Sequence, residues 1–276
     1  MRLGELRALL EAHGLRPNPR FGQNFLVDPA LLTSIPGDAG VVAGERVLEV
    51  GPGAGALTAE LLRVGAQVLA VEVDHGLAGL LRERFADALA DGSLQLLEDD
   101  VLAAHERFAA EVEAWWGAGP PPRLVANLPY AISGPFLGRL PGRPLLGATL
   151  LLQREVARKA CGLDDGWSPL GVRLALAFHT RVGRRLPPEV FWPRPQVDSA
   201  FLHLEPRADA PGAAADARLH AALRVAYAQR RKRLLPRLRK AEPAWAEALV
   251  ALGVGEDARA EEVAPETWHR ALHALS

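Results

Sequence analysis

The chain has 276 residues, which is enough for one large domain and a smaller one. Its 32 Lys and Arg residues nearly balance its 33 Asp and Glu residues, so the molecule as a whole is not a basic nucleic-acid binder. The single cysteine excludes an intramolecular disulfide and a cysteine-based zinc site. No apolar run is long enough to cross a bilayer, and residues 1–15 mix charges with leucines, which is typical of an amphipathic helix and not of a signal peptide. We therefore expect a cytoplasmic protein without a membrane segment.

Short apolar runs alternate with helical patterns along most of the chain. The predicted strands cover residues 46–50, 67–73, 93–97, 123–126, 145–152 and 197–204, and the predicted helices cover residues 57–64, 76–90 and 154–161. Residues 172–181 form either a strand or a buried helical segment, and periodicity does not decide between the two. Strands that alternate with helices predict right-handed crossovers and a mostly parallel α/β sheet with helices on both faces.

The pattern changes near residue 207. Residues 208–215 are rich in Ala, Pro, Gly and Asp, which is typical of a linker, and residues 217–276 have a helical pattern throughout. We therefore predict two domains, at residues 1–206 and 207–276.

Three features at successive strand ends indicate a nucleoside site. Gly51, Gly53 and Gly55 follow the first strand of the alternating region, Glu72 ends the second, and Asp100 follows the third. Glycines permit a tight turn at a helix N-terminus, and a carboxylate at the second strand can accept ribose hydroxyls. A carboxylate at the third can accept from an adenine amino group. Either acid alone is more often a solvated loop residue, but the ordered set favours an adenosine-shaped slot.

The slot suits either NAD or S-adenosylmethionine, and the end of the fourth strand favours the latter. Residues 127–130 follow this strand and resemble the Asn/Asp-Pro-Pro-Tyr type motif of amino-methyltransferases, whereas the glycine spacing departs from the dinucleotide pattern. An exocyclic adenine amine is a weak nucleophile that needs hydrogen-bond acceptors, which the Asn127 oxygen and carbonyls near Leu128 supply. Pro129 restricts the local backbone and Tyr130 offers a ring for stacking. In isolation this tetrapeptide would be an ordinary strand-ending turn.

The sequence resembles the bacterial 16S ribosomal RNA adenine N6-dimethyltransferases over nearly its whole length. The matching segments are residues 21–26 (FGQNFL), 48–58, 71–74 (VEVD), 99–101 (DDV), 127–130 (NLPY), 191–200 (FWPRPQVDSA) and 229–232 (QRRK). The resemblance implies a Rossmann-like, seven-stranded S-adenosylmethionine-dependent methyltransferase sheet with a small all-α C-terminal domain that binds rRNA.

The resemblance also implies roles for particular residues. It places the cofactor, whose demethylated product is S-adenosylhomocysteine, on Gln23, Asn24, Leu26, Val101 and Asn127, in addition to the residues of the slot. It makes Phe191 a second stacking face for the target base. The implied reaction dimethylates two adjacent adenines in a hairpin loop near the 3′ end of 16S rRNA, within the immature 30S subunit. We expect a monomer that uses no metal.

A basic segment indicates where RNA would bind. Residues 224–240 hold eight Lys and Arg residues and no acid, which suits phosphate contacts, although a solvated helical face is the simpler explanation for any single arginine. The residues that we predict to contact RNA are Arg224, Arg230, Arg231, Lys232 and Arg233. Pro236, which follows them, should kink or restart the helix.

Three other functions are compatible with parts of the sequence. One is a large-subunit rRNA methyltransferase of the macrolide-resistance type, against which the Leu128 motif and the QRRK segment argue. Another is a ribosome-assembly factor that acts mainly by binding. The last is an NAD-linked oxidoreductase.

Overall fold

The computed structural model describes residues 1–103, 107–164, 166–229 and 232–275. The chain forms two compact units. Unit 1 comprises Met1–Phe136, Pro144–Arg154 and Val182–Leu204, and unit 2 comprises Leu137–Arg143, Glu155–Arg181 and Glu205–Ser276. Unit 2 thus includes two stretches that precede the predicted boundary near residue 207. The division into functional domains at residues 1–206 and 207–276 stays a prediction.

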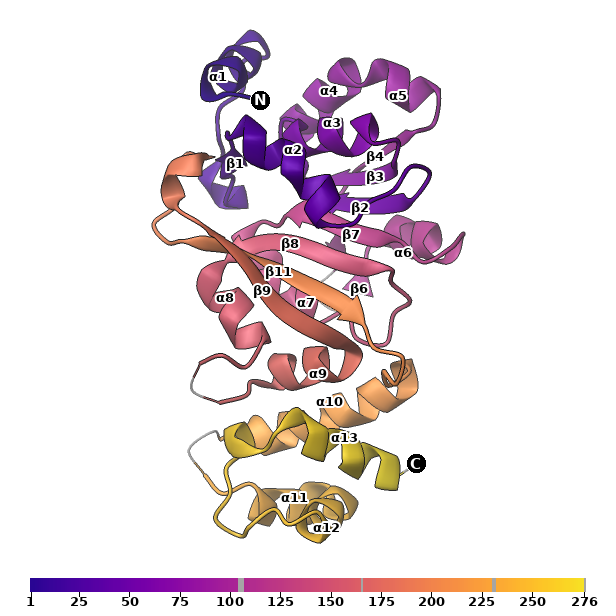
Figure 1. The fold of residues 1–276 in the computed structure, drawn as a ribbon, viewed down its shortest axis with the longest axis vertical. Coiled ribbons are helices and arrows are strands. Elements are labelled where there is room, and N and C mark those ends of the chain that lie inside the picture. Colours follow the sequence, from indigo (N-terminus) through magenta and orange to yellow (C-terminus); the bar gives the residue numbers. More distant parts are fainter. Residues whose placement is uncertain (104–106, 165, 230–231, 276) are drawn as a thin grey trace. The chain divides into compact units, whose positions relative to one another are not determined.

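A seven-stranded sheet runs through the molecule in the order β4-β3-β2-β7-β8-β11-β9 (Figure 1). Its strands are β2 (Arg46–Val50), β3 (Gln67–Glu72), β4 (Leu94–Glu98), β7 (Arg123–Asn127), β8 (Gly147–Gln153), β9 (Phe178–Leu186) and β11 (Ser199–Pro206). The first five are parallel to one another, and β11 is antiparallel to β8. This confirms the expected Rossmann-like sheet.

The parallel register brings four strand ends to one edge of the sheet. Val50 of β2 lies opposite Val71 of β3, and Glu72 lies opposite Glu98 of β4. On the other side of β2, Leu48 lies opposite Leu124 of β7. The loops that follow β2, β3, β4 and β7 therefore start side by side, where open α/β sheets bind their ligands.

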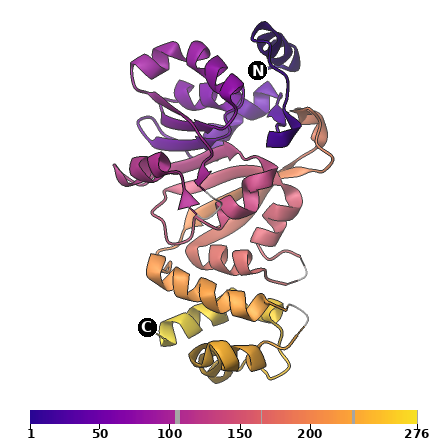
Figure 2. The ribbon, with the colours of Figure 1, turned by 180° about the vertical axis from the view of Figure 1, so that it is seen from behind.

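Helices cover both faces of this sheet, as Figures 1 and 2 show. The helical segments whose residues lie wholly or mainly in unit 1 are α1 (Leu3–Ala12), η1 (Pro19–Phe21), α2 (Pro29–Asp38), α3 (Ala56–Arg63), α4 (His75–Arg84), α5 (Ala86–Ala90), α6 (Ala110–Gly117), η2 (Tyr130–Ile132), α7 (Ser133–Leu137) and η3 (Pro188–Val190). Alternate strand residues such as Val47, Val68 and Val125 pack in one core with α2 and α3, as the period of a strand requires. The sequence did not predict α2 or α6.

Two short ladders lie outside the main sheet. β1 (Phe25–Leu26) pairs with β10 (Phe191–Trp192), and β5 (Leu102–Ala103) pairs with β6 (Arg107–Phe108). The β1–β10 ladder joins two segments that are more than 160 positions apart in the sequence. It fastens the N-terminal segment beside the rest of unit 1.

Unit 2 is mainly helical. Its segments are α8 (Arg154–Ala160), which begins at the last residue of a unit 1 stretch, α9 (Pro169–Ala177), α10 (Ala213–Tyr227), α11 (Leu235–Ala241), α12 (Pro243–Ala251), η4 (Ala260–Glu262) and α13 (Pro265–Ala274). Residues 172–181, left open by periodicity, divide between α9 and β9. Pro236 lies in the first turn of α11, where its missing N–H breaks no helical bond, so the helix restarts there.

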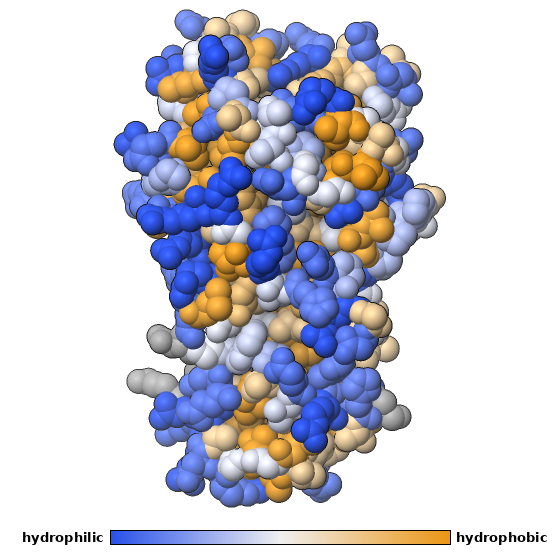
Figure 3. Space-filling model, in the orientation of Figure 1, coloured by the Kyte–Doolittle hydropathy of each residue, from blue (hydrophilic) through white to orange (hydrophobic). Residues whose placement is uncertain are grey.

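Val42, Leu163 and Val250 are among the large apolar side chains that are exposed, and the face drawn in Figure 3 mixes hydrophilic and apolar residues. Among the helices in the described ranges, none is long and apolar enough to span a membrane.

A buried ion pair fastens α9 to α10 within unit 2. Arg173 donates two hydrogen bonds to Asp216, at 2.9 Å and 2.6 Å, and both residues are 7% exposed. We expect Arg173→Met to lower the free energy of unfolding by about 3 kcal/mol, because it leaves a buried carboxylate without its partner. The double variant Arg173→Met/Asp216→Leu should recover most of this loss. Urea denaturation of both variants checks this, and a double variant no more stable than the single one would contradict it.

Candidate active site

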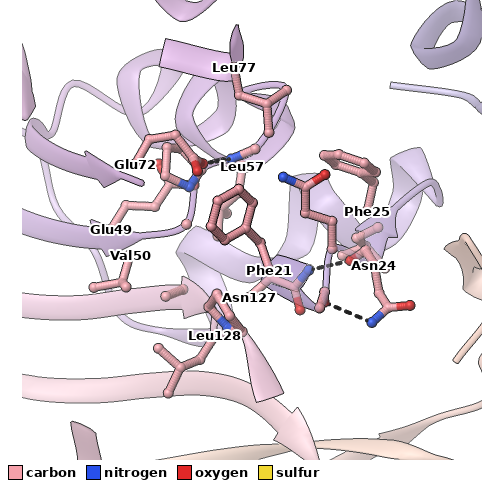
Figure 4. A pocket seen from close by; sticks show the side chains of 18 of the residues that line it. Phe21, Asn24, Phe25, Glu49, Val50, Leu57, Glu72, Leu77, Asn127 and Leu128 are labelled. Carbon is pink, nitrogen blue, oxygen red and sulfur yellow. Dashed lines mark hydrogen bonds between the residues drawn. The ribbon is translucent and has the colours of Figure 1, made fainter. Parts of the chain in front are cut away.

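A cavity opens at the sheet edge where the four strand ends meet (Figure 4). Most of the residues predicted for the cofactor and the target base line it: Gln23, Asn24, Leu26, Gly51, Gly53, Glu72, Asp100, Val101, Asn127, Leu128, Pro129 and Tyr130. Segments that are distant in the sequence therefore share one site. In the described ranges, no group of three or more His, Cys, Asp or Glu side chains could hold a metal ion.

The glycine loop forms one wall of the cavity. Gly51 and Gly53 have φ values of 67° and 59°, which side-chain-bearing residues rarely adopt. A Cβ on Gly53 would lie 2.8 Å from the Phe25 ring, and one on Gly51 would lie 3.0 Å from Pro129. The loop therefore packs closely on both the N-terminal segment and the motif after β7, which only glycine permits.

Gly55 differs from what the sequence led us to expect. It is the N-cap of α3, and a Cβ there would collide with the ring of Phe85 and lie 2.9 Å from Leu81. It is not among the residues that line the cavity. Its glycine is explained by helix packing, so the prediction that it contacts the cofactor is not supported.

Glu72 ends β3 with a buried carboxylate that is 4% exposed. One oxygen accepts a hydrogen bond from the backbone N–H of Gly53 at 3.0 Å, and the other accepts from the N–H of Asp74 at 2.9 Å. Burial raises its pKa, and the two backbone donors oppose that rise. The carboxylate is thus fixed against the glycine loop, and its remaining lone pairs can accept hydroxyl groups. Asp100, which is exposed, accepts from Leu102 N–H at 2.9 Å.

Asn127 lies at the end of β7, with its amide facing the N-terminal segment. Its Nδ2 donates to the backbone carbonyl of Asn24 at 2.9 Å, so Oδ1 is the end of the amide that can accept from a substrate. The backbone N–H of Leu128 donates to Leu151 of β8 at 2.9 Å, which continues the ladder into the motif. The hydroxyl groups of Tyr130 and Ser199 are 2.6 Å apart, and burial raises the pKa of Tyr130. These contacts hold the motif rigidly beside the cavity.

The N-terminal segment, residues 18–26, contacts three of the strand ends. Gln23 Nε2 donates to Asp74 Oδ2 at 3.0 Å, and Asp74 also caps α4. The Asn24 carbonyl accepts from Asn127, and Leu26 pairs with Phe191. The sequence marked this segment only through its resemblance to a known motif, because none of these contacts is local.

Two aromatic residues are placed differently from the expectation. Phe191 is 3% exposed in the core beside Leu26 and is not among the cavity-lining residues, because the β1–β10 ladder buries it. The structure therefore does not present it as a second stacking face. Phe21, which the sequence did not single out for a role, lines the cavity from η1.

The basic segment is partly neutralised by acids from another part of unit 2. Arg233 lies 3.1 Å from Asp257, and Arg239 makes a two-pronged contact with Glu256. Arg224 and Lys232 are exposed and, within the described ranges, show no acidic partner. Arg230 and Arg231 lie outside the described residues.

Glu49 predicts a pH dependence of stability. It is 1% exposed and accepts a hydrogen bond from Thr58 at 2.7 Å, and burial raises its pKa from 4.5 to about 8. The protonated form is thus favoured on folding, so the stabilisation present below pH 4.5 is lost as the pH rises through about 8. Glu49→Gln cannot ionise, and its stability relative to the wild type should increase by about 3 kcal/mol between pH 5 and 8.5. Urea denaturation across this range measures the difference, and a constant value would contradict the prediction.

The fold and the site together define a Rossmann-like methyltransferase. The comparisons with known proteins then identify the family. The family described as "Ribosomal RNA adenine dimethylase" matches residues 14–276, and the chain belongs to this family.

Curated relatives and solved structures agree with this membership. The chain is 40% identical over 236 residues to the ribosomal RNA small subunit methyltransferase A of Magnetococcus marinus, covering 84% of this chain and 82% of the relative. It is 38% identical to the protein of that name from Synechococcus sp., covering 95% and 97%. The crystal structure of 23S rRNA methyltransferase ErmE superposes with a TM-score of 0.68 and 29% identity, covering 91% of this chain and 99% of that one.

Proposed function

We propose that this enzyme transfers methyl groups from S-adenosylmethionine to the N6 amines of two adjacent adenines near the 3′ end of 16S rRNA. The observation that carries the proposal is that residues 127–130 share one cavity with the glycine loop and with two acidic strand ends. A target amine at this motif would lie within the same site as an adenosine cofactor. The immature 30S subunit, a cytoplasmic location and a monomeric state belong to the same proposal.

The cavity residues fit the cofactor. Glu72 offers a fixed, buried carboxylate for the ribose hydroxyls, and Asp100 offers an acceptor for the adenine amino group. Gln23, Asn24, Leu26 and Val101 also line the cavity. The cofactor supplies an activated methyl group, so the protein's contribution is binding and orientation.

Asn127 would prepare the accepting amine. Because its Nδ2 is committed to Asn24, Oδ1 faces the substrate as an acceptor, which holds an N–H of the adenine amine and favours a pyramidal nitrogen. Tyr130 would stack on the adenine while Ser199 fixes its hydroxyl group. Leu128 and Pro129 set the backbone that carries both side chains.

Small-subunit rRNA is favoured over the large-subunit alternative. The curated relatives at 38–40% identity are named for the small subunit, whereas the structural relative named for 23S rRNA is 29% identical. We assign residues 207–276 to RNA binding, with Arg224, Lys232 and Arg233, and with Arg230 and Arg231 on sequence grounds alone.

Methylation of purified precursor subunits tests the proposal. Unmethylated 30S and 50S particles are incubated with cofactor labelled in its methyl group, and the modified nucleotide is mapped by mass spectrometry. We expect dimethyladenosine at two adjacent positions of 16S rRNA, and label in 23S rRNA alone would overturn the proposal. Asn127→Ala should lower the rate about 100-fold or more. If that inactive variant still supported subunit maturation, binding would be the main role.

Glu72 gives a test of the cofactor site. Glu72→Ala removes the acceptor for the ribose, so we expect the Kd for S-adenosylmethionine to rise at least 10-fold while RNA affinity changes less than twofold. Calorimetry measures the first and filter binding the second. Equal cofactor affinity in variant and wild type would remove Glu72 from the site. NAD binding by the wild type would favour the oxidoreductase alternative.

The basic segment gives a test with a built-in control. Arg224→Gln/Lys232→Gln removes two charges that have no acidic partner among the described residues, so the slope of log Kd for RNA against log salt should become shallower by about 1 or more. Arg239→Gln is the matched control, because Glu256 already neutralises that arginine. If the double variant and the control changed the slope equally, the segment would be only a solvated helical face and the prediction would be wrong.

A further inference from the structure

The ring of Phe21 lines the cavity. In the view of Figure 4 it lies between the carboxylate of Glu72 and the amide of Asn127, and all three residues line the same cavity. Phe21 is the last residue of η1, and Gly22 follows it with a φ of 60°. The chain turns sharply at this glycine, and Gln23 and Asn24 then make their contacts with Asp74 and Asn127.

The other aromatic residues that line the cavity have different contacts. The ring of Phe25 packs on Gly53, and Tyr130, whose ring the proposed function assigns to the target adenine, bonds to Ser199 through its hydroxyl group. Phe201 is 4% exposed in the core of the sheet. Phe21 is only half-buried, and no ring pair or cation contact within the described ranges involves it. Its face is therefore available to a ligand.

The chemistry of the cofactor indicates which of its groups the ring of Phe21 would contact. The sulfonium sulfur of S-adenosylmethionine joins the ribose to the methyl group that is transferred. If Glu72 holds the ribose and Asn127 holds the accepting amine, as the proposed function states, the sulfonium must lie between them. The face of an aromatic ring attracts a cation, most strongly where water is excluded.

Nearby carboxyl groups do not replace this attraction. Burial raises the pKa of Glu49, which also lines the cavity, to about 8, so its carboxyl group holds a proton to a higher pH than a free one does. Glu72 already accepts two backbone hydrogen bonds. A neutral π face can therefore stabilise the sulfonium without competing for the ribose.

We propose that Phe21 is a cation–π platform for the sulfonium of S-adenosylmethionine and that it favours the charged cofactor over its neutral product, S-adenosylhomocysteine. This inference rests on the proposed function. Because the positive charge disappears when the methyl group leaves, the attraction is lost in the product complex. Phe21 is thus a specificity-determining residue that promotes product release.

Calorimetry with three ligands tests the role of Phe21. S-adenosylmethionine and sinefungin, whose amino group carries a positive charge near the position of the sulfonium, are compared with S-adenosylhomocysteine on the wild type and on Phe21→Leu. We expect Phe21→Leu to raise the Kd of both cations about fivefold and that of S-adenosylhomocysteine less than twofold. Phe21→Trp should retain the wild-type preference, since it keeps a π face. The thermal midpoint of each variant shows whether it is folded.

Phe25→Leu is the matched control, because its ring packs on the glycine loop and should affect all three ligands alike. Equal weakening of all three ligands by Phe21→Leu would show that the ring acts by packing alone, and tighter binding of all three would show that it obstructs the cavity. Either result overturns the inference while leaving the proposed function in place. A wild type that binds none of the three ligands would refute the proposed function itself.

Discussion

The site depends on the parallel register of β4, β3, β2 and β7. Because these strands end at the same edge, the glycine loop, Glu72, Asp100 and Asn127 converge although they span almost 80 positions of the sequence. The backbone ladders fix this convergence before any side chain contributes. The convergence also brings the buried carboxylate of Glu72 to the neighbouring loop, where it accepts a hydrogen bond from the backbone N–H of Gly53. A strand slipped by one residue would turn these side chains to the other face of the sheet.

The N-terminal segment completes the cavity from outside the sheet. Its contacts are a few hydrogen bonds and one short ladder: Gln23 to Asp74, Asn24 to Asn127, and β1 to β10. The ladder also buries apolar surface, because Leu26 and Phe191 belong to the same core as the strands beneath. The segment is thus held by the core as well as by hydrogen bonds. Phe21, for which we propose a role in distinguishing ligands, lies on this segment.

Electrostatics in the two units follow different rules. In the cavity, burial has the largest effect on Glu49 and Glu72 and raises the pKa of each carboxyl group. The hydrogen bonds that each carboxyl group accepts oppose this rise. On the basic segment of unit 2, exposed charges pair with acids that the sequence places some 20 residues away, such as Glu256 with Arg239. Surface pairs of this kind add little to stability. They do reduce the number of charges that could meet RNA phosphates, so we propose Arg224 and Lys232 as the first described candidates for that contact.

The sequence by itself determined the features that have a local cause. Periodicity and glycine placement predicted every strand of the parallel region within about two residues, and the order of the strand-end motifs predicted that most of these residues, Gly55 excepted, share a cavity. The sequence did not show the effects of long-range packing. The helix predicted at residues 76–90 breaks at Phe85, whose ring lies against Gly55. Residues 172–181 divide between a helix and a strand. The same limit explains the site. The pairing of β1 with β10 buries Phe191 and the turn at Gly22 places Phe21 in the cavity, and no local pattern encodes either contact because the partners are distant in the chain.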